Sequence, residues 1–356
     1  MRLFRAAFIS TAVLLSTALG GCATAGIGAK IPSVQALRET PPVNALVTDD
    51  AADDPAIWVA PDVLKSRIIG TQKKGGIFVY DLNAALVQEA PGGLPNNVDL
   101  KDGFPFADGV GAIVSASDRS DHSMPIWKLR PDGTLDPKPR ARIPSGFAEI
   151  YGFCMGRIGD QFYAVATSKI GEVGLWKLTP SSDGAAGTLV KKWSLGSISE
   201  GCVVDEHAEA FYVSQELVGL WRFDMKALGE PVSVDRVAPQ GNLAPDVEGV
   251  TLWDGGEGAG YLIVSAQGEN RFAVYDRKGG AYRGSFQIGA GAAQGVDGVS
   301  GTDGLDVTSV PLGADFPRGL VVVQDDENTD PVQPQNFKYV SWADVEKALG
   351  LTEPVR

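Results

Sequence analysis

The sequence predicts an all-β fold: a six-bladed β-propeller whose antiparallel blades each contain three to five strands. A short unit, a glycine or polar residue followed by an apolar and aromatic strand, recurs six times along the chain. Phe78, Trp127 and Trp176 mark the first three copies at intervals of 49 residues, and Trp221 marks the fourth after 45. Repeats of this length, built from short strands, are typical of propellers, because a blade can bury its faces only against neighbouring blades.

Each repeat is expected to contain three strands in a fixed order. An inner strand comes first, a second β-rich stretch follows, and the aromatic strand comes third; glycine, proline, aspartate and asparagine separate them. The inner strands are expected at residues 55–59, 97–100, 151–155, 202–205, 249–253 and 305–310, the second strands at 67–71, 112–116, 163–167, 211–214, 261–265 and 320–323, and the aromatic strands at 76–80, 125–129, 174–178, 219–223, 271–275 and 336–340.

Two further segments complete the predicted ring. Residues 33–47 precede the first repeat and are expected to add a strand to the last blade. Helical periodicity is nearly absent, and only residues 342–349 are expected to form a short helix, with Ser341 as its N-cap. A pair of β-sandwiches is the alternative fold, but it does not account for the regular repeat.

The N-terminus has the pattern of a bacterial lipoprotein signal peptide, expected over residues 1–21. Arg2 and Arg5 precede an apolar run at residues 6–19, which is short for a membrane span, and small residues lead to Cys22. We therefore expect export and lipidation of Cys22, with residues 22–33 as a linker and 34–356 as one propeller domain. Ala23 favours the outer membrane, facing the periplasm or the cell surface. An ordinary signal peptide with a chance cysteine is the alternative and also implies export.

The chain is acidic. Its formal charge of −13 becomes −15 without the leader, which carries two arginines and no acidic residue. Such a surface repels nucleic acid and anionic membranes, so we expect no nucleic-acid partner, attachment through the lipid alone, and a monomer. Two cysteines remain, Cys154 and Cys202. The favoured interpretation makes them small apolar core residues, although an oxidising compartment would permit a disulfide.

Charged residues gather at two positions of the repeat, directly before the inner strand and directly after the second strand. In an antiparallel blade both positions lie at the same edge, so these side chains are expected to converge on one rim around the channel mouth. The first position holds Asp53, Asp54, Asn97, Asp99, Glu149, Glu200, Asp246, Glu248, Asp303 and Asp306, and the second holds Lys73, Lys74, Asp118, Arg119, Lys169, Glu216, Gln267, Asn270 and residues 325–328.

This rim predicts both a metal and an anionic substrate. Clustered carboxylates repel one another unless a hard divalent cation lies between them. Calcium accepts six to eight oxygen ligands in irregular geometry, which suits ligands from separate blades. Zinc is disfavoured, since the chain has two histidines and no paired cysteine motif. Lys73, Arg119 and Lys169 are not needed by a metal site, but they suit phosphate oxygens.

Ten short blocks, in order along the chain, resemble one family. They are residues 50–58, 71–76, 96–99, 117–120, 149–153, 199–201, 245–249, 302–307, 324–328 and 335–338. By these blocks the chain is similar to the β-propeller phytases, the calcium-dependent 3-phytase or alkaline phytase family, here in a lipoprotein form. The resemblance implies hydrolysis of phytate, the hexakisphosphate of inositol, with several calcium ions as cofactor and with phytate or calcium-phytate as the partner.

The resemblance also implies roles for particular residues. Pro41-Pro42 and Gly301 depart from the family pattern, so one peripheral calcium is expected to be weaker or missing, and Ile170 replaces a frequently acidic neighbour of the rim lysine. The implied calcium ligands are Asp53, Asp54, Glu200, Glu216, Asp246, Glu248, Asp306 and Asp325. The implied substrate-binding residues are Lys73, Arg119, Tyr151 and Lys169, and the residues expected to take part in catalysis are Glu200, Asp246, Glu248, Lys73, Arg119 and Lys169.

The expected reaction is an in-line attack on phosphorus by a water held between calcium ions. Glu200 and Asp246 would orient this water, while the rim cations offset charge on the non-bridging oxygens. His122 and His207 lie in turn sequences and suggest no nucleophile. Two alternatives stay open: a calcium-dependent propeller lactonase or esterase, whose centre would contain few lysines and arginines, and a non-catalytic calcium-binding propeller.

Overall fold

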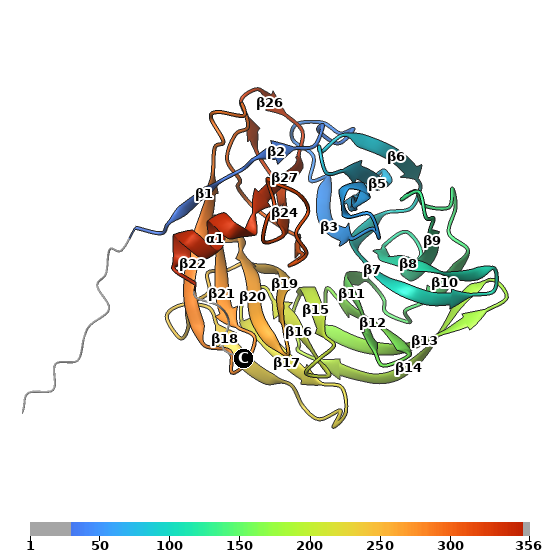
Figure 1. Ribbon diagram of the computed structural model, residues 1–356. Coiled ribbons are helices and arrows are strands. Elements are labelled where there is room, and N and C mark those ends of the chain that lie inside the picture. Colours follow the sequence, from blue (N-terminus) through green and yellow to red (C-terminus); the bar gives the residue numbers. More distant parts are fainter. Residues whose placement is uncertain (1–29, 352–356) are drawn as a thin grey trace, which may run out of the picture. The chain divides into compact units, whose positions relative to one another are not determined.

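The computed structural model describes residues 30–351, and the chain from Ile31 onward forms one compact unit. Six small sheets follow one another around a ring, coloured from blue to red in Figure 1. The fold is a six-bladed β-propeller, as predicted. The predicted signal peptide, Cys22 and the predicted linker up to residue 29 lie outside the described residues. Among the described residues, no helix has the length and apolarity that a membrane crossing requires.

The first four blades are four-stranded antiparallel sheets, with strands following in chain order from the channel outward. Blade one contains β3 (Ala52–Trp58), β4 (Arg67–Gln72), β5 (Gly76–Asp81) and β6 (Leu86–Pro91); blade two contains β7 (Pro95–Phe106), β8 (Gly109–Asp118), β9 (Ser123–Leu129) and β10 (Ala141–Pro144). Blade three contains β11 (Ile150–Ile158), β12 (Gln161–Ser168), β13 (Glu172–Ser181) and β14 (Gly184–Ser194); blade four contains β15 (Ser199–Asp205), β16 (Ala210–Gln215), β17 (Gly219–Asp224) and β18 (Val232–Arg236).

The N-terminal segment joins the last two blades. Blade five contains β19 (Val247–Gly256), β20 (Ala259–Ala266), β21 (Arg271–Asp276), β22 (Tyr282–Gly289) and β1 (Ser33–Gln35); blade six contains β23 (Leu305–Val307), β24 (Leu320–Asp325), β27 (Asn336–Ser341) and β2 (Arg38–Glu39). Strand β2 pairs antiparallel with β27, which confirms the expected strand in the last blade. Strand β1 pairs parallel with β22, which the sequence did not predict.

The remaining short elements of the described residues lie outside the blade sheets. A two-stranded ribbon follows β24, and two 3-10 turns connect strands elsewhere: β25 (Asn328–Thr329), β26 (Val332–Gln333), η1 (Val63–Lys65) and η2 (Gln267–Glu269). The predicted helix is confirmed as α1 (Trp342–Leu349) and ends at the left-handed Gly350. Ser341 is its N-cap residue, but its side chain makes no capping hydrogen bond.

Aromatic side chains hold neighbouring blades together. Phe104 of β7 packs edge-on against Phe162 of β12, with ring centroids 5.1 Å apart. The buried Trp342 of α1 stacks on Trp253 of β19 at 5.5 Å, which fixes the helix against blade five. Edge-to-face and offset aromatic contacts of this kind add to the free energy gained from burial alone. Tyr80 and Phe337, both in aromatic strands of the repeat, pack between blades one and six with ring centroids 6.1 Å apart, so the repeat contributes to the packing between blades.

A disulfide cross-links blades three and four. Cys154 on β11 and Cys202 on β15 are bonded, and both are buried. The favoured interpretation as unbonded core residues was therefore wrong, although their burial was expected. The sequence could not decide between the two, because residues 48 positions apart are brought together only by the packing of one inner strand against the next.

Candidate active site

The two charged positions of the repeat meet at one edge of each blade, as predicted. Antiparallel pairing places Ser199 opposite Gln215, which brings Glu200 and Glu216 to the same end of blade four. The inner strand is irregular at this end in blades one to five, where its register shifts at Ala52/Pro55, Pro95/Val98, Ile150/Phe153, Ser199/Cys202 and Val247/Val250. Bulges re-aim side chains, so in these five blades the rim residues depart from simple alternation.

Glycines next to these rim residues allow the inner strands to approach one another closely. A Cβ atom on Gly152 would collide with the Glu200 backbone carbonyl, and one on Gly201 would collide with that of Glu248. The same relation holds between Gly249 and the backbone at Asp303. Glycine is the residue that permits such close backbone approach. The carboxylate-bearing segments of blades three to six therefore pack directly on one another.

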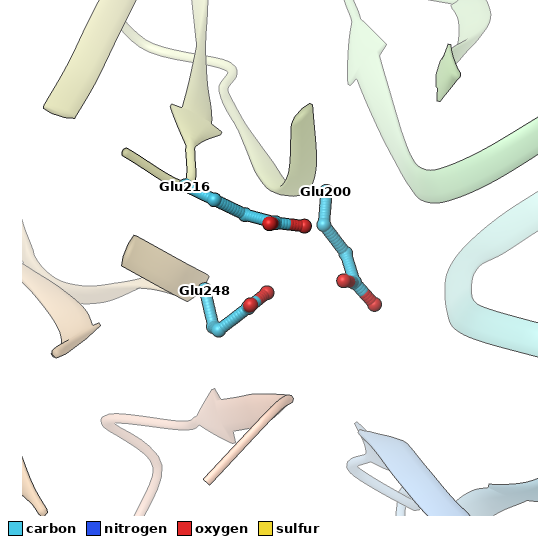
Figure 2. A group of neighbouring side chains, drawn as sticks. All are labelled: Glu200, Glu216 and Glu248. Atoms are coloured by element: carbon cyan, nitrogen blue, oxygen red, sulfur yellow. The ribbon is translucent and has the colours of Figure 1, made fainter. Parts of the chain in front are cut away.

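Three glutamates point toward one another at the channel mouth (Figure 2). Glu200 is the second residue of β15, Glu216 follows β16, and Glu248 is the second residue of β19. One carboxylate oxygen from each lies within 4.8 Å of the others. Burial, together with the charges of Asp53 and Asp303, raises the pKa of Glu200 to about 8. Burial and the neighbouring Glu200 also raise the pKa of Glu248 well above its usual range.

A buried lysine lies beside these glutamates. Lys73 Nζ is 2.6 Å from Asp50 and 2.9 Å from both Asp53 and Asp303. Burial opposes the charge of Lys73, but the surrounding carboxylates outweigh it and raise the lysine pKa. Glu200 is one of the charges that act on this ammonium group. Cations and acids thus share one site at the rim.

Polar groups of blades two and three complete the site. Asn96 Nδ2 donates to Glu200 Oε1 at 2.6 Å. Tyr151 is half-buried, and proximity to Glu200, followed by burial, raises its pKa, which keeps the phenol protonated. Lys169 Nζ lies 5.0 Å from the centre of the Tyr151 ring and 3.0 Å from Glu149. Arg119 Nη2 donates to the Lys73 carbonyl at 3.1 Å.

Comparison with known proteins identifies the family. A family model described as Phytase matches residues 4–355. The chain belongs to the phytase family. The 3-phytase of Bacillus subtilis strain 168 is 38% identical over 333 residues, which cover 89% of this chain and 85% of that protein. The crystal structure of the computationally designed Ika8 protein aligns with this chain at 13% identity and a TM-score of 0.44. The alignment covers 80% of this chain and 70% of the Ika8 chain.

Membership of the phytase family makes the chain an enzyme whose substrate is phytate. Within the phytase site, the glutamate cluster brings together three of the eight residues expected to bind calcium. Asp53 contacts Lys73, which lies beside this cluster, and Asp246 is half-buried. Burial and, second, the negative charge of the nearby Asp246 raise the pKa of Glu216. All four residues expected to bind substrate lie around the same rim.

Three other expected ligands lie apart from the glutamates. Asp54 and Asp306 line a channel cavity of about 270 Å³, where Asp54 accepts the Val98 N–H at 3.0 Å and Asp306 accepts the Ile57 N–H at 2.8 Å. Asp325 is buried in blade six, 3.2 Å from Lys338 Nζ. These carboxylates already have partners in the protein.

Asp303 was expected on the rim, but it was not among the residues predicted to bind calcium, bind substrate or take part in catalysis. In the structure Asp303 contacts Lys73, and burial raises its pKa to about 7. Asn96 and Asp50 were also left out, although both belong to blocks that match the family. Their position before an inner strand, the same as that of Asp53, was the available signal.

The glutamate cluster suits a hard divalent cation. All of its donors are carboxylate oxygens, and Glu248 Oε2 is buried with no hydrogen-bond partner among the described residues. A buried, unpartnered carboxylate oxygen is unfavourable unless a positive charge approaches it. Calcium prefers oxygen ligands and tolerates irregular arrangements. Glu200, Glu216 and Glu248 are therefore suited to hold such an ion.

Proposed function

We propose that this phytase requires calcium and releases inorganic phosphate from phytate at the rim formed by the three glutamates. The arrangement of Glu200, Glu216 and Glu248, with the charge of Glu200 acting on the Lys73 ammonium, supports this most directly. An acidic chain attracts a polyanion only where positive charge gathers. At this rim, Lys73 supplies one positive charge, and a metal ion held by the carboxylates beside it would supply more. Calcium bound at this site would lower the pKa of a water molecule and neutralise charge on the phosphoryl oxygens.

The chain's own residues position the substrate. Arg119 anchors its guanidinium on the Lys73 and Leu94 carbonyls, which leaves the rest of the planar donor fork for phosphate oxygens. Lys169, above the Tyr151 ring, supplies a second positive charge. Asn96 holds Glu200 in place through its 2.6 Å hydrogen bond. A second phosphate on the inositol ring would dock beside the first and favour polyphosphorylated substrates through effective concentration.

Phosphate release tests this proposal. Purified protein is incubated with phytate in calcium, in excess chelator, and in chelator followed by calcium. We expect release in calcium, loss of release with chelator and recovery on calcium addition. Release that is unaffected by chelator would contradict the calcium requirement. Hydrolysis of a lactone or carboxylic ester, with no release from phytate, would support the propeller esterase instead.

We also propose that the protein is an exported monomer, anchored through a lipid on Cys22 at the outer membrane. The Cys154–Cys202 disulfide supports export, because such bonds persist in oxidising compartments. Fractionation of cells that produce the wild type and Cys22→Ser tests the anchor. We expect the wild type in the membrane fraction and the variant in the soluble exported fraction. Equal membrane association of both would contradict a lipid on Cys22.

A further inference from the structure

A buried hydroxyl occurs at the same place in each of the first five blades, two residues before the rim residue that directly follows the second strand. These hydroxyl residues are enclosed, with at most 1% of their surface exposed. A buried hydroxyl is unfavourable unless it is hydrogen-bonded, so its partners indicate what it does. The hydroxyl residues are Thr71, Ser117, Thr167, Ser214 and Ser265, and the rim residues that follow them are Lys73, Arg119, Lys169, Glu216 and Gln267.

Thr167 joins blade three to blade four. Its hydroxyl accepts the Gly152 N–H at 2.9 Å and donates to the Ser199 carbonyl. Gly152 lies in the bulge of β11, where the ladder to β12 is interrupted between Ile150 and Phe153, and Ser199 begins β15. A hydroxyl carries one donor and two acceptor positions, so one oxygen can hold both strands. The bridge therefore ties the bulge of one blade to the inner strand of the next.

Thr71 joins blade one to blade two in the same way. Its hydroxyl accepts the Asp54 N–H at 3.0 Å and donates to the Asn96 carbonyl. Asp54 lies in the bulge of β3, and Asn96 is the second residue of β7. The Asn96 side chain in turn donates to Glu200 at 2.6 Å. Thr71 therefore acts on the position of Glu200 through Asn96.

Ser117 joins blade two to blade three. Its hydroxyl accepts the Asn97 N–H at 3.1 Å and donates to the Tyr151 carbonyl. Asn97 lies in the bulge of β7, and Tyr151 lies in that of β11 with Lys169 over its ring. This bridge therefore sets the position of a residue that is expected to bind substrate.

The bridges leave little freedom to the backbone behind the rim. A Cβ atom on Gly152 would lie 1.8 Å from the Glu200 carbonyl oxygen and 2.6 Å from Thr167 Oγ1. Thr167 Oγ1 also lies 3.5 Å from the Glu200 carbonyl oxygen. Glu200 is thus held through its backbone from blade three and through its carboxylate by Asn96 from blade two.

Ser214 has the same place at the joint between blades four and five but makes no bridge. Its Oγ atom has no hydrogen-bond partner among residues 30–351. Ser265 of blade five donates to the Thr302 carbonyl at 2.8 Å, ahead of β23. Ser117 and Ser214 are therefore one residue type at one repeat position, both buried, and only Ser117 bridges two blades.

We infer that Thr71, Ser117 and Thr167 are positioning residues that set the spacing of the first four inner strands at the rim and so place Tyr151 and Glu200 for the reaction. The inference rests on the proposed function, since Glu200 is taken as a calcium ligand and Tyr151 as part of the substrate site. None of the three residues is exposed to solvent, so each acts through the backbone carbonyl to which it donates.

Replacement of Ser117 and of Ser214 by alanine tests the inference as a matched pair. Misplacement by about 1 Å of a group that positions substrate can lower a rate by about 100-fold. We expect kcat for phytate to fall roughly 10- to 100-fold in Ser117→Ala, because Tyr151 loses its tie to blade two. Ser214→Ala removes an equal side chain that bridges nothing, so kcat should equal that of the wild type. Both are assayed in calcium below their Tm, with folding checked by circular dichroism.

Thr167→Val and Thr167→Ser form a second pair. Valine has the size of threonine but no hydroxyl, so kcat and the calcium affinity measured by titration calorimetry should both fall. Serine restores the hydroxyl and should recover both. Thr40→Val is the control for stability, since the buried Thr40 directly follows β2 at the outer edge of blade six and accepts the Phe337 N–H at 3.1 Å. It should lower Tm and leave kcat unchanged.

Equal kcat in Ser117→Ala and Ser214→Ala would overturn the inference. A Thr167→Val protein that loses only Tm, as expected for Thr40→Val, would also overturn it, because the bridge would then serve the fold alone. If chelator leaves phosphate release by the wild type unchanged, the calcium requirement of the proposed function fails. The comparison of kcat between the two serine variants still decides the inference in that case.

Discussion

Replacement of Glu200 by glutamine should have opposite effects on stability with and without calcium. Glu200 is 2% exposed and has a pKa of about 8 instead of 4.5, because it is buried close to other acids. At pH 7 the calcium-free folded protein therefore keeps this carboxyl protonated, whereas the unfolded chain ionises it. That difference destabilises the folded state by about 3 kcal/mol. Glutamine is neutral at every pH and avoids this cost.

In chelator at pH 7, Glu200→Gln should therefore be more stable than the wild type by at most about 3 kcal/mol, a rise in Tm on the order of 5 °C. In calcium the order should reverse, since the variant lacks one carboxylate ligand, and phosphate release should be lost. Thermal unfolding followed by circular dichroism, in chelator and in calcium, measures both effects. Glu230→Gln, at an exposed position, is the matched control. If the variant gained as much stability from calcium as the wild type, Glu200 would not be a calcium ligand.

Three further predictions follow from buried charges and from the disulfide. Glu200 and Asp303 have pKa values raised to about 8 and about 7, so the folded state binds more protons than the unfolded chain. In chelator, the two groups should therefore lower the free energy of unfolding as the pH rises from about 4.5 to about 8. Calcium affinity, measured by titration calorimetry, should increase over the same pH range. Lys338→Met should lower the free energy of unfolding by about 3–5 kcal/mol in denaturant titrations, because it leaves Glu39, Asp297 and Asp325 without their buried cation; an unchanged midpoint would contradict this. Replacing Cys154 and Cys202 together by serine should lower the same quantity by about 2–4 kcal/mol, and equal stability of the oxidised wild type and the double variant would show that the bond contributes nothing.

The sequence predicted the inner, second and aromatic strands because these strands are buried and therefore apolar. Strand β5 is an example, since five of its six residues are buried. Apart from β2, the outermost strands were not predicted. Strand β6 has one buried residue among six, so its composition resembles that of a loop. Its pairing with β5 depends on backbone hydrogen bonds, which leave no residue pattern.

The rim was predictable because antiparallel pairing fixes which ends of the strands meet. The sequence did not reveal which of the rim acids would cluster. Asp53 and Asp54 are adjacent in sequence, yet Asp53 contacts Lys73 and Asp54 lines the channel. A bulge lies between their strand and β4, so the alternation of side chains along the sequence does not tell which of the two aspartates faces the rim.

Asp325 shows a second limit of the sequence. Asp325 is the last residue of β24, the second strand of its blade, and Glu216 directly follows the second strand of blade four. Despite this equivalent position, Asp325 pairs with the buried Lys338. Lys338 lies within an aromatic strand, where alternation would place a lysine on an exposed face. Its burial depends on Glu39, which comes from strand β2 at the other end of the chain, and sequence spacing does not reveal that contact.

Anomalous diffraction from a calcium-loaded crystal would show whether the rim glutamates bind calcium. We expect a calcium ion held jointly by the carboxylates that blades four and five extend into the channel mouth. Well-ordered glutamates with no ion between them, at calcium concentrations that support phosphate release, would contradict it.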